Sequence, residues 1–277
     1  MRVGAFRRRP VGRTGRASAA AQKPHPCIPL KFYRSVYRFL LKMTATFRIQ
    51  RYNPEKDAKP YFKDYTLTDL DPTFRILDAL HEIKWKMDGT LTFRRSCAHG
   101  MCGSDGMRIN GRNALACAKL LKDVNANKPI VIEPLPFLPI IKDLAVDQSD
   151  FFRKYEMTKP WLITETPPPQ TERLQSHADA ELLMESTKCI LCACCTTSCP
   201  SLWSNENYIG PAAILKSYRF AFDSRDEAPE EHMAAMDSPD GVWRCHTIFN
   251  CVEACPKEIN VTWHISQVKK KIVTMEL

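Results

Sequence analysis

The sequence predicts an α+β N-terminal half followed by a mostly helical C-terminal half. Strand-like alternation around one helix precedes residue 148, apolar residues at helical spacing follow it, and most cysteines cluster between these elements. The 277 residues are 44% hydrophobic and 26% charged, which is typical of a folded protein and excludes global disorder. No run of about 18 apolar residues lacks a charge, so no segment is expected to span a membrane by itself.

The first half begins with two expected strands, at 47–52 and 61–67, separated by a turn at Asn53-Pro54. Asp71-Pro72 predicts an N-cap followed by the first helical position. The apolar face of that helix is expected to contain Ile76, Leu77, Leu80 and Ile83.

The rest of the first half has short elements around a glycine-rich loop. A strand is expected at 91–95, a tight hairpin at Asn110-Gly111 and a last strand at 130–133. Prolines 167–169 then predict a stiff connector. Helices are expected at 181–186, 212–222 and 261–273, with cysteine loops between them. We therefore expect domains at 43–148 and 149–277.

The positive charge is confined to the N-terminus. The net charge is +9, but residues 1–42 hold eleven of the 40 basic residues and none of the 31 acidic ones, so the remainder carries −2. This basic leader is typical of a transit peptide, and an over-called start before Met43 explains it equally well. Because the body is slightly acidic, a nucleic-acid-binding protein is disfavoured, and no nucleic acid is expected as a partner.

The first cysteine group is Cys97-x4-Cys102-x2-Asp105, with Cys117 further on. This is the plant-type [2Fe–2S] spacing with aspartate in the third position. A carboxylate oxygen can bind iron, so Asp105 is a candidate fourth ligand; the alternative is a site completed by another group. Four glycines in or beside the loop allow the tight backbone that such a site requires.

Two later runs share one register. The first is Cys189-x2-Cys192-x2-Cys195-x3-Cys199-Pro, which is the bacterial ferredoxin pattern. The second is Cys245-x2-Ile248-x2-Cys251-x3-Cys255-Pro, with isoleucine in the middle position.

In the bacterial pattern the fourth cysteine binds the other cluster, so the fourth ligands are exchanged between the runs. A [4Fe–4S] site is predicted from Cys189, Cys192, Cys195 and Cys255. A [3Fe–4S] site is predicted from Cys199, Cys245 and Cys251, because Ile248 cannot bind iron. Zinc is disfavoured, because structural zinc sites use paired CxxC motifs without an interleaved CxxxCP. Cys194 is interpreted as a buried spacer and Cys27 as a bystander. Three redox centres in one chain favour an electron carrier.

These motifs resemble those of the iron–sulfur subunit of succinate dehydrogenase, respiratory complex II. The resemblance rests on SCAHGMCGSDG at 96–106, CILCACCTTSCPSLW at 189–203, GPAAILKSYRFAFDSRD at 210–226 and RCHTIFNCVEACPK at 244–257. It covers about residues 46–272. It implies a β-grasp plant-type ferredoxin domain, then a helical bacterial-type ferredoxin domain. It also implies electron flow from an FAD-containing flavoprotein subunit through three clusters to ubiquinone, beside membrane-anchor subunits.

The resemblance further implies quinone-binding positions, which are Pro200, Ser201, Trp203, His246 and Ile248. Trp203 is alternatively a packed aromatic, and His246 a surface or capping residue or a proton or haem-propionate contact. Many members have a second Trp where this sequence has Ser204. Asp105 resembles some bacterial members, which favours a bacterial protein on the cytoplasmic face of the inner membrane; the alternative is the mitochondrial matrix side. A quinol:fumarate reductase subunit is the alternative function.

Overall fold

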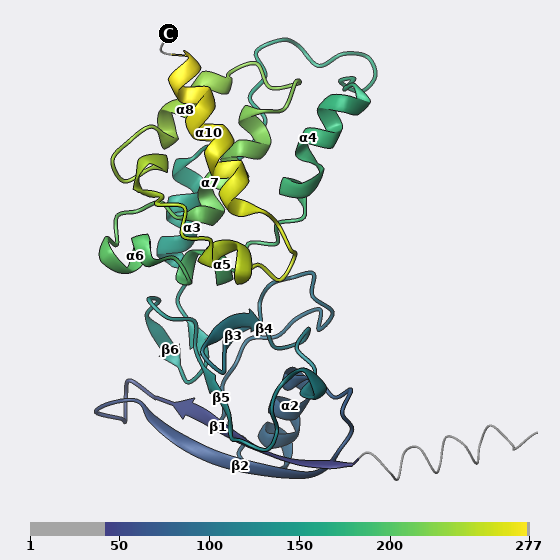
Figure 1. Cartoon of the computed structure of the whole chain (residues 1–277), viewed down its shortest axis with the longest axis vertical. Helices are drawn as coiled ribbons and strands as arrows, with labels where there is room; N and C mark the ends of the chain where they lie inside the picture. Colours follow the sequence, from purple (N-terminus) through teal and green to yellow (C-terminus); the bar gives the residue numbers. More distant parts are fainter. Residues whose placement is uncertain (1–41, 276–277) are drawn as a thin grey trace, which may run out of the picture. The chain divides into compact units, whose positions relative to one another are not determined.

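The computed structural model describes residues 42–275. The predicted leader therefore lies outside the described residues except for Lys42, and so does Cys27. The described chain begins with a five-stranded sheet of order β2-β1-β5-β3-β4 (Figure 1). Its strands are β1 (Met43–Arg51), β2 (Tyr61–Leu70), β3 (Gly106–Ile109), β4 (Arg112–Leu115) and β5 (Ile130–Glu133).

Alternation in β1 builds one side of the first core. Ala45, Phe47 and Ile49 are buried, and β1 pairs antiparallel with β2 and parallel with β5. A parallel neighbour needs a long crossover, which here contains helix α2 (Ile76–Lys86). The apolar face predicted for this helix is confirmed, because its four residues are all buried.

The predicted start of α2 is wrong. The helix begins at Ile76 rather than at Pro72. Asp71 instead forms a local turn, since its Oδ1 accepts hydrogen bonds from Thr73 N–H at 2.8 Å and Thr73 O–H at 2.7 Å. An aspartate bonded to the backbone two residues on makes such a turn as readily as an N-cap.

The hairpin at Asn110-Gly111 is confirmed, with φ of +49° and +80° between β3 and β4. The strand predicted at 91–95 is wrong, because these residues belong to no sheet. Thr92 N–H donates to the Asp143 carboxylate, and Thr92 O accepts from Leu144 N–H. The strand at 130–133 is confirmed, but it is not the last. A small ribbon of β6 (Ile140–Lys142) and β7 (Ala145–Val146) follows it.

The C-terminal half is helical around α7 (Pro211–Ala221), which contacts the other long helices. Those are α3 (Ser149–Met157), α4 (His177–Thr187), α8 (Pro229–Met236) and α10 (Val261–Met275). The three predicted helices are confirmed within a few residues, whereas α3 and α8 were not predicted. The short elements are η1 (Leu121–Asp123), α5 (Cys194–Thr197), α6 (Pro200–Ser204), η2 (Val242–Arg244) and α9 (Asn250–Glu253).

Both halves contribute to one continuous hydrophobic core. Between residues 42 and 275 no helix combines the length and the apolar character needed to cross a membrane.

Candidate iron–sulfur sites

The first cysteine loop surrounds the Cys97 sulfur with backbone donors. The N–H groups of His99, Met101 and Cys102 point at it over 3.5, 3.4 and 3.3 Å. The His99 and Met101 N–H groups are the main reason that the pKa of Cys97 falls to about 7. Because a thiolate is the form that binds metal, the loop favours the ligating state of this side chain.

Asp105 lies beside Cys117 at the buried end of the same loop. Asp105 is 2% exposed, and its Oδ2 accepts a hydrogen bond from Cys117 N–H at 2.6 Å. Oδ1 is buried with no hydrogen-bond partner among residues 42–275. Burial and the neighbouring Asp105 raise the pKa of Cys117 to about 12. A buried carboxylate and thiol of this kind gain free energy from a cation, so the donor set fits a two-iron cluster.

Glycine brings the first loop against the second. A Cβ on Gly103 would lie 2.9 Å from Cys192 Cβ and 2.9 Å from Ile190 O, and the residue has φ of +71°. A Cβ on Gly106 would lie 3.0 Å from Cys192 O. The two loops therefore touch only because these positions have no side chain. The sequence predicted that these glycines allow the tight backbone around one cluster. Gly103 and Gly106 also allow the first cysteine loop to contact the second.

The two later runs have the same backbone. Leu191 and Ala193 flank Cys192 with φ of +53° and +62°, while Thr247 and Phe249 flank Ile248 with φ of +57° and +70°. Each run then enters a four-residue helix, α5 or α9. Left-handed backbone at four non-glycine residues costs free energy, so its repetition at matching positions indicates one loop design used twice.

One cavity is lined by four cysteines from both runs. Its lining includes Cys189, Cys192, Cys195 and Cys255, together with Ala212 and Leu215 of α7. This is the cysteine set predicted for [4Fe–4S], and the fourth member comes from the other run. Burial raises the pKa values of Cys189, Cys195 and Cys255, because a low-dielectric surrounding disfavours a thiolate.

A second cavity is lined by the other three cysteines, Cys199, Cys245 and Cys251. Ser201 and Tyr208 line it too, and their hydroxyl oxygens are buried without a hydrogen-bond partner in the described chain. Unpaired hydroxyl donors beside three thiols fit a cluster whose sulfides accept hydrogen bonds. Cys195 lies in α5 and Cys251 in α9, and these two helices contact each other, so the two cavities are neighbours. Tyr208 was not predicted, and no sequence motif marked it.

No three His, Cys, Asp or Glu side chains in the described range 42–275 gather around a point where one metal ion would bind. Ligands of an iron–sulfur cluster bind separate iron atoms, so they are spread around the cluster rather than around a single ion. The wide arrangement thus differs from that of a zinc site, in which all ligands meet at one ion.

Cys194 and Asn113 link strand β4 to the first of the two later cysteine runs. A hydrogen bond from the fully buried Cys194 thiol lowers the pKa of Cys192. Asn113 of β4 donates to Cys194 O at 3.1 Å and Thr197 Oγ1 at 2.8 Å. Cys194 is therefore buried as predicted and also donates to a candidate ligand. Asn113 was missed, because a lone asparagine gives no signal of a contact 81 residues away.

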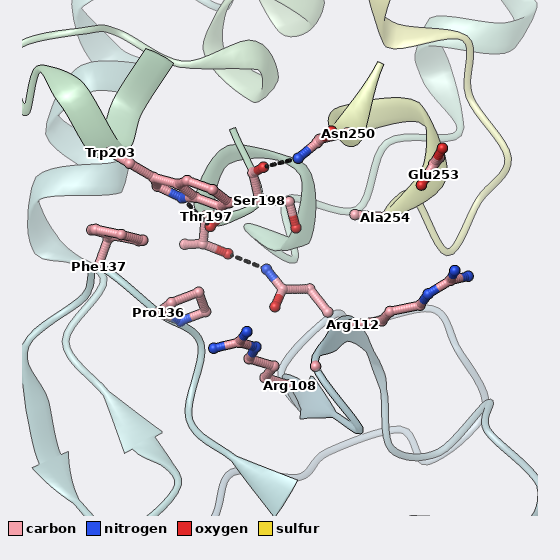
Figure 2. A pocket seen from close by; sticks show the side chains of 12 residues that line it. Arg108, Arg112, Pro136, Phe137, Thr197, Ser198, Trp203, Asn250, Glu253 and Ala254 are labelled. Atoms are coloured by element: carbon pink, nitrogen blue, oxygen red, sulfur yellow. Dashed lines mark hydrogen bonds between the residues drawn. The ribbon is translucent and has the colours of Figure 1, made fainter. Parts of the chain in front are cut away.

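The structure separates the predicted quinone residues into two places. Pro200, Ser201, His246 and Ile248 line the three-cysteine cavity. Trp203 instead borders another cavity, where its ring stacks on Phe137 with centroids 5.4 Å apart (Figure 2). Its indole N–H donates to Thr197 O at 3.0 Å. Trp203 is thus stacked and hydrogen-bonded on one side, but it is 45% exposed, so its role at the quinone stays a prediction. His246 makes no hydrogen bond with any described residue, so it does not cap a helix.

Ser204 occupies the position at which many relatives have a second tryptophan. Its hydroxyl donates to Ser201 O at 3.0 Å, so it is bonded within α6.

The paired ferredoxin loops define an iron–sulfur protein with one sheet-borne and one helical cluster domain. A family model for a 2Fe-2S iron-sulfur cluster binding domain matches residues 46–153, and one for a 4Fe-4S dicluster domain matches 181–256. The chain is 46% identical over 230 residues to the succinate dehydrogenase iron-sulfur subunit of Coxiella burnetii, covering 82% of this chain and 97% of that one. It is also 46% identical over 231 residues to the mitochondrial succinate dehydrogenase [ubiquinone] iron-sulfur subunit 1 of Oryza sativa subsp. japonica, covering 82% of each. The chain belongs to the family of succinate dehydrogenase iron–sulfur subunits.

A solved structure shares the fold. The chain superposes on one from the Mycobacterium smegmatis Sdh1 complex in the apo form with a TM-score of 0.73 and 24% identity, covering 84% of this chain and 97% of that one. The predicted α+β fold class with two ferredoxin domains is confirmed. So are the three cofactors, because the matched domains account for [2Fe–2S] and [4Fe–4S] and the family carries [3Fe–4S] as well. The chain is a component of an oxidoreductase, and the relatives' names do not favour the fumarate reductase alternative.

Proposed function

We propose that this chain conducts electrons from the FAD-containing flavoprotein subunit of succinate dehydrogenase to ubiquinone. The observation that supports this best is the partition of seven cysteines into two neighbouring cavities of four and three. When bound, each cluster takes up and releases one electron at a time. The protein's part is to hold the three centres close together in order, which the contact between Gly103 and Cys192 favours.

The ligand assignment is part of the proposal. The [2Fe–2S] cluster is held by Cys97, Cys102, Asp105 and Cys117. The [4Fe–4S] cluster is held by Cys189, Cys192, Cys195 and Cys255, and the [3Fe–4S] cluster by Cys199, Cys245 and Cys251. The backbone donors around Cys97 support the first set, and the cavity linings support the other two. We place the division between the domains at 148/149.

The quinone is proposed to approach the three-cysteine cavity. Pro200, Ser201, His246 and Ile248 line this cavity, and Ile248 and the neighbouring Phe249 are both about half exposed. An exposed apolar rim suits a hydrophobic ring, and the His246 ring suits proton delivery to a quinone oxygen. Trp203 acts indirectly, because its stacking on Phe137 and its bond to Thr197 fix the position of α6.

Membrane-anchor subunits complete the complex in this proposal. Both relatives are named as subunits, which supports partner chains in a larger complex, and ubiquinone is part of the name of the rice relative. The chain is expected to lie peripherally on the inner membrane, on the cytoplasmic face in a bacterium or the matrix face in a mitochondrion.

Purification of the complex from membranes, followed by EPR spectroscopy, tests the proposal. Succinate should reduce the [2Fe–2S] and [3Fe–4S] clusters, as followed by their EPR signals. Ubiquinone added afterwards should reoxidise these clusters. As a control, dithionite reduces every reducible cluster, so the EPR signals after dithionite give the total number of clusters. Centres that dithionite reduces but succinate does not would overturn the proposed electron donor. A preparation without a three-iron signal would overturn the ligand assignment.

A further inference from the structure

Helix α7 contains a largely buried lysine that forms no hydrogen bond or ion pair with a described residue. Lys216 is 7% exposed, and it forms no ion pair or hydrogen bond with any residue in the described range. The Nζ of Lys216 is not among the fully buried atoms without a partner, so the ammonium group keeps some contact with water. A negative group placed nearby would still be stabilised by this largely buried charge.

The position of Lys216 indicates what that group is. It lies one helical turn after Ala212 and directly after Leu215, both of which line the four-cysteine cavity. Residues four apart share a helix face, so Lys216 extends the side of α7 that faces this cavity. Helix α4 packs on α7 and ends just before Cys189. Burial raises the pKa of the Cys189 thiol and the positive charge of Lys216 opposes that rise, while burial lowers the pKa of Lys216 itself.

Other charged groups nearby do not cancel this charge. Arg219, one turn further along α7, adds positive charge and is partly exposed. Tyr155 of α3 also interacts with Cys189 and Arg219, and burial raises its pKa, so it stays neutral. The surroundings of Cys189 on this side are therefore positive.

We propose that Lys216 is an electrostatic tuning residue for the [4Fe–4S] site, the cluster itself being its counter-ion. The inference rests on the ligand assignment proposed above. Four thiolates give the bound cluster a net negative charge, which grows by one when it accepts an electron from the reduced [2Fe–2S] cluster. No bond forms or breaks in that step. A fixed ammonium group beside Cys189 stabilises the reduced state more than the oxidised state, so it raises the reduction potential of the middle centre.

Potentiometric EPR titration of the purified holo complex tests this role. In Lys216→Gln and Lys216→Met, the one-electron reduction equilibrium of [4Fe–4S] should become about tenfold less favourable, equivalent to a shift of about 59 mV to lower potential. Lys216→Arg keeps the charge and should restore most of the potential. Lys271→Gln is the matched control, because Lys271 is another partly buried lysine, but it bonds to Ala221 O at 2.6 Å and its charged neighbours are Glu230 and Asp226.

The outcomes separate the two proposals. An unchanged [4Fe–4S] potential in both neutral variants, with all three signals present, overturns the tuning role and leaves the proposed function intact. An equal shift in Lys216→Arg also overturns it, since a packing effect would explain that result. A wild-type complex without a four-iron signal overturns the ligand assignment. Because a midpoint potential does not depend on how much cluster is present, partial cluster loss in one variant does not prevent the comparison.

Discussion

The cysteine runs at 189–199 and 245–255 have nearly the same backbone and different middle residues. Both place left-handed residues on either side of the middle position and both enter a short helix. Cys192 is 8% exposed and contacts the first cluster loop, whereas Ile248 is 49% exposed. On the proposed ligand assignment, the repeated loop makes one centre that is enclosed between two others and one that is open at its fourth corner. An open corner beside an exposed apolar rim is where a substrate can approach.

The largest expected effect comes from Ile248→Cys, which gives the second run the ligand of the first. The exposed site has room for the smaller side chain, and the matching backbone should aim its thiol at the cavity. We expect a [4Fe–4S] signal to replace the [3Fe–4S] signal, with at least a tenfold loss of succinate:quinone reductase activity. EPR and quinone reduction measure this. Ile248→Val is the control, because it keeps an apolar residue and should keep three irons.

The reverse exchange should be tolerated far less well. Cys192→Ile introduces a larger side chain where Gly103 leaves little space, and overpacking of this kind costs about 1–3 kcal/mol. We expect loss of the four-iron cluster rather than conversion to a second three-iron cluster. Stable assembly of two three-iron clusters would show that burial does not distinguish the runs.

Gly103→Ala tests the contact between the first loop and Cys192. The new Cβ would clash with Cys192 and adopt an unfavourable φ, at a cost of about 2–4 kcal/mol in total. Thermal loss of cluster absorbance should occur at lower temperature, and magnetic coupling between the first two clusters should weaken. Gly111→Ala is matched, because Gly111 also has positive φ but nothing lies within 4 Å of its Cβ. It should cost only about 1–2 kcal/mol and leave the coupling unchanged. Equal effects of the two variants would contradict the close-approach role.

Substitutions of Asp105 test whether a residue other than cysteine at a ligand position binds iron. Ile248 cannot, whereas Asp105 has a buried oxygen without a protein partner. Asp105→Cys should keep the [2Fe–2S] cluster and change its potential, and Asp105→Ala should lose cluster. Potentiometric EPR provides the measurement. An Asp105→Cys variant with unchanged spectrum and potential would indicate that this carboxylate only accepts the hydrogen bond from Cys117.

The smallest expected effect concerns the connector that leads into the first run. Glu227 accepts hydrogen bonds from Thr166 O–H, Thr166 N–H and Glu165 N–H, and it pairs with Arg173 at 3.1 Å. The Thr166 hydroxyl is the main reason that its pKa falls from 4.5 to about 2. Because the folded pKa is depressed, this stabilisation is present above about pH 4.5 and is lost as the pH falls towards 2.

At neutral pH, Glu227→Gln should release the connector and speed tryptic cleavage after Arg173. Glu230→Gln is the control, since its exposed carboxylate begins α8 and takes no part in this contact. Unchanged cleavage in Glu227→Gln would show that the proline run alone holds the connector. The second run has no comparable connector before it, so its cluster loop should not respond to either change.

Local patterns predicted the elements that depend on local chemistry. The alternation in β1, the apolar face of α2 and the Asn110-Gly111 turn each follow from side chains within a few residues. Asp71 misled the prediction because one aspartate can cap a helix or form a turn, and the choice depends on where the following chain packs. Residues 91–95 misled it because a segment becomes a strand only when a neighbour offers a continuous row of backbone partners, and here Leu144 N–H bonds to Thr92 O without such a row.

The spacing of the cysteines predicted the cluster types and the exchange of fourth ligands, because coordination by one short loop restricts sequence separation directly. Only the tertiary structure placed Gly103 against Cys192, Asn113 against Cys194, and the side of α7 that carries Lys216 against the four-cysteine cavity. It also placed the Trp203 ring against Phe137. Those placements depend on how helices and strands distant in sequence pack together, and packing selects partners by shape and charge that no local spacing encodes.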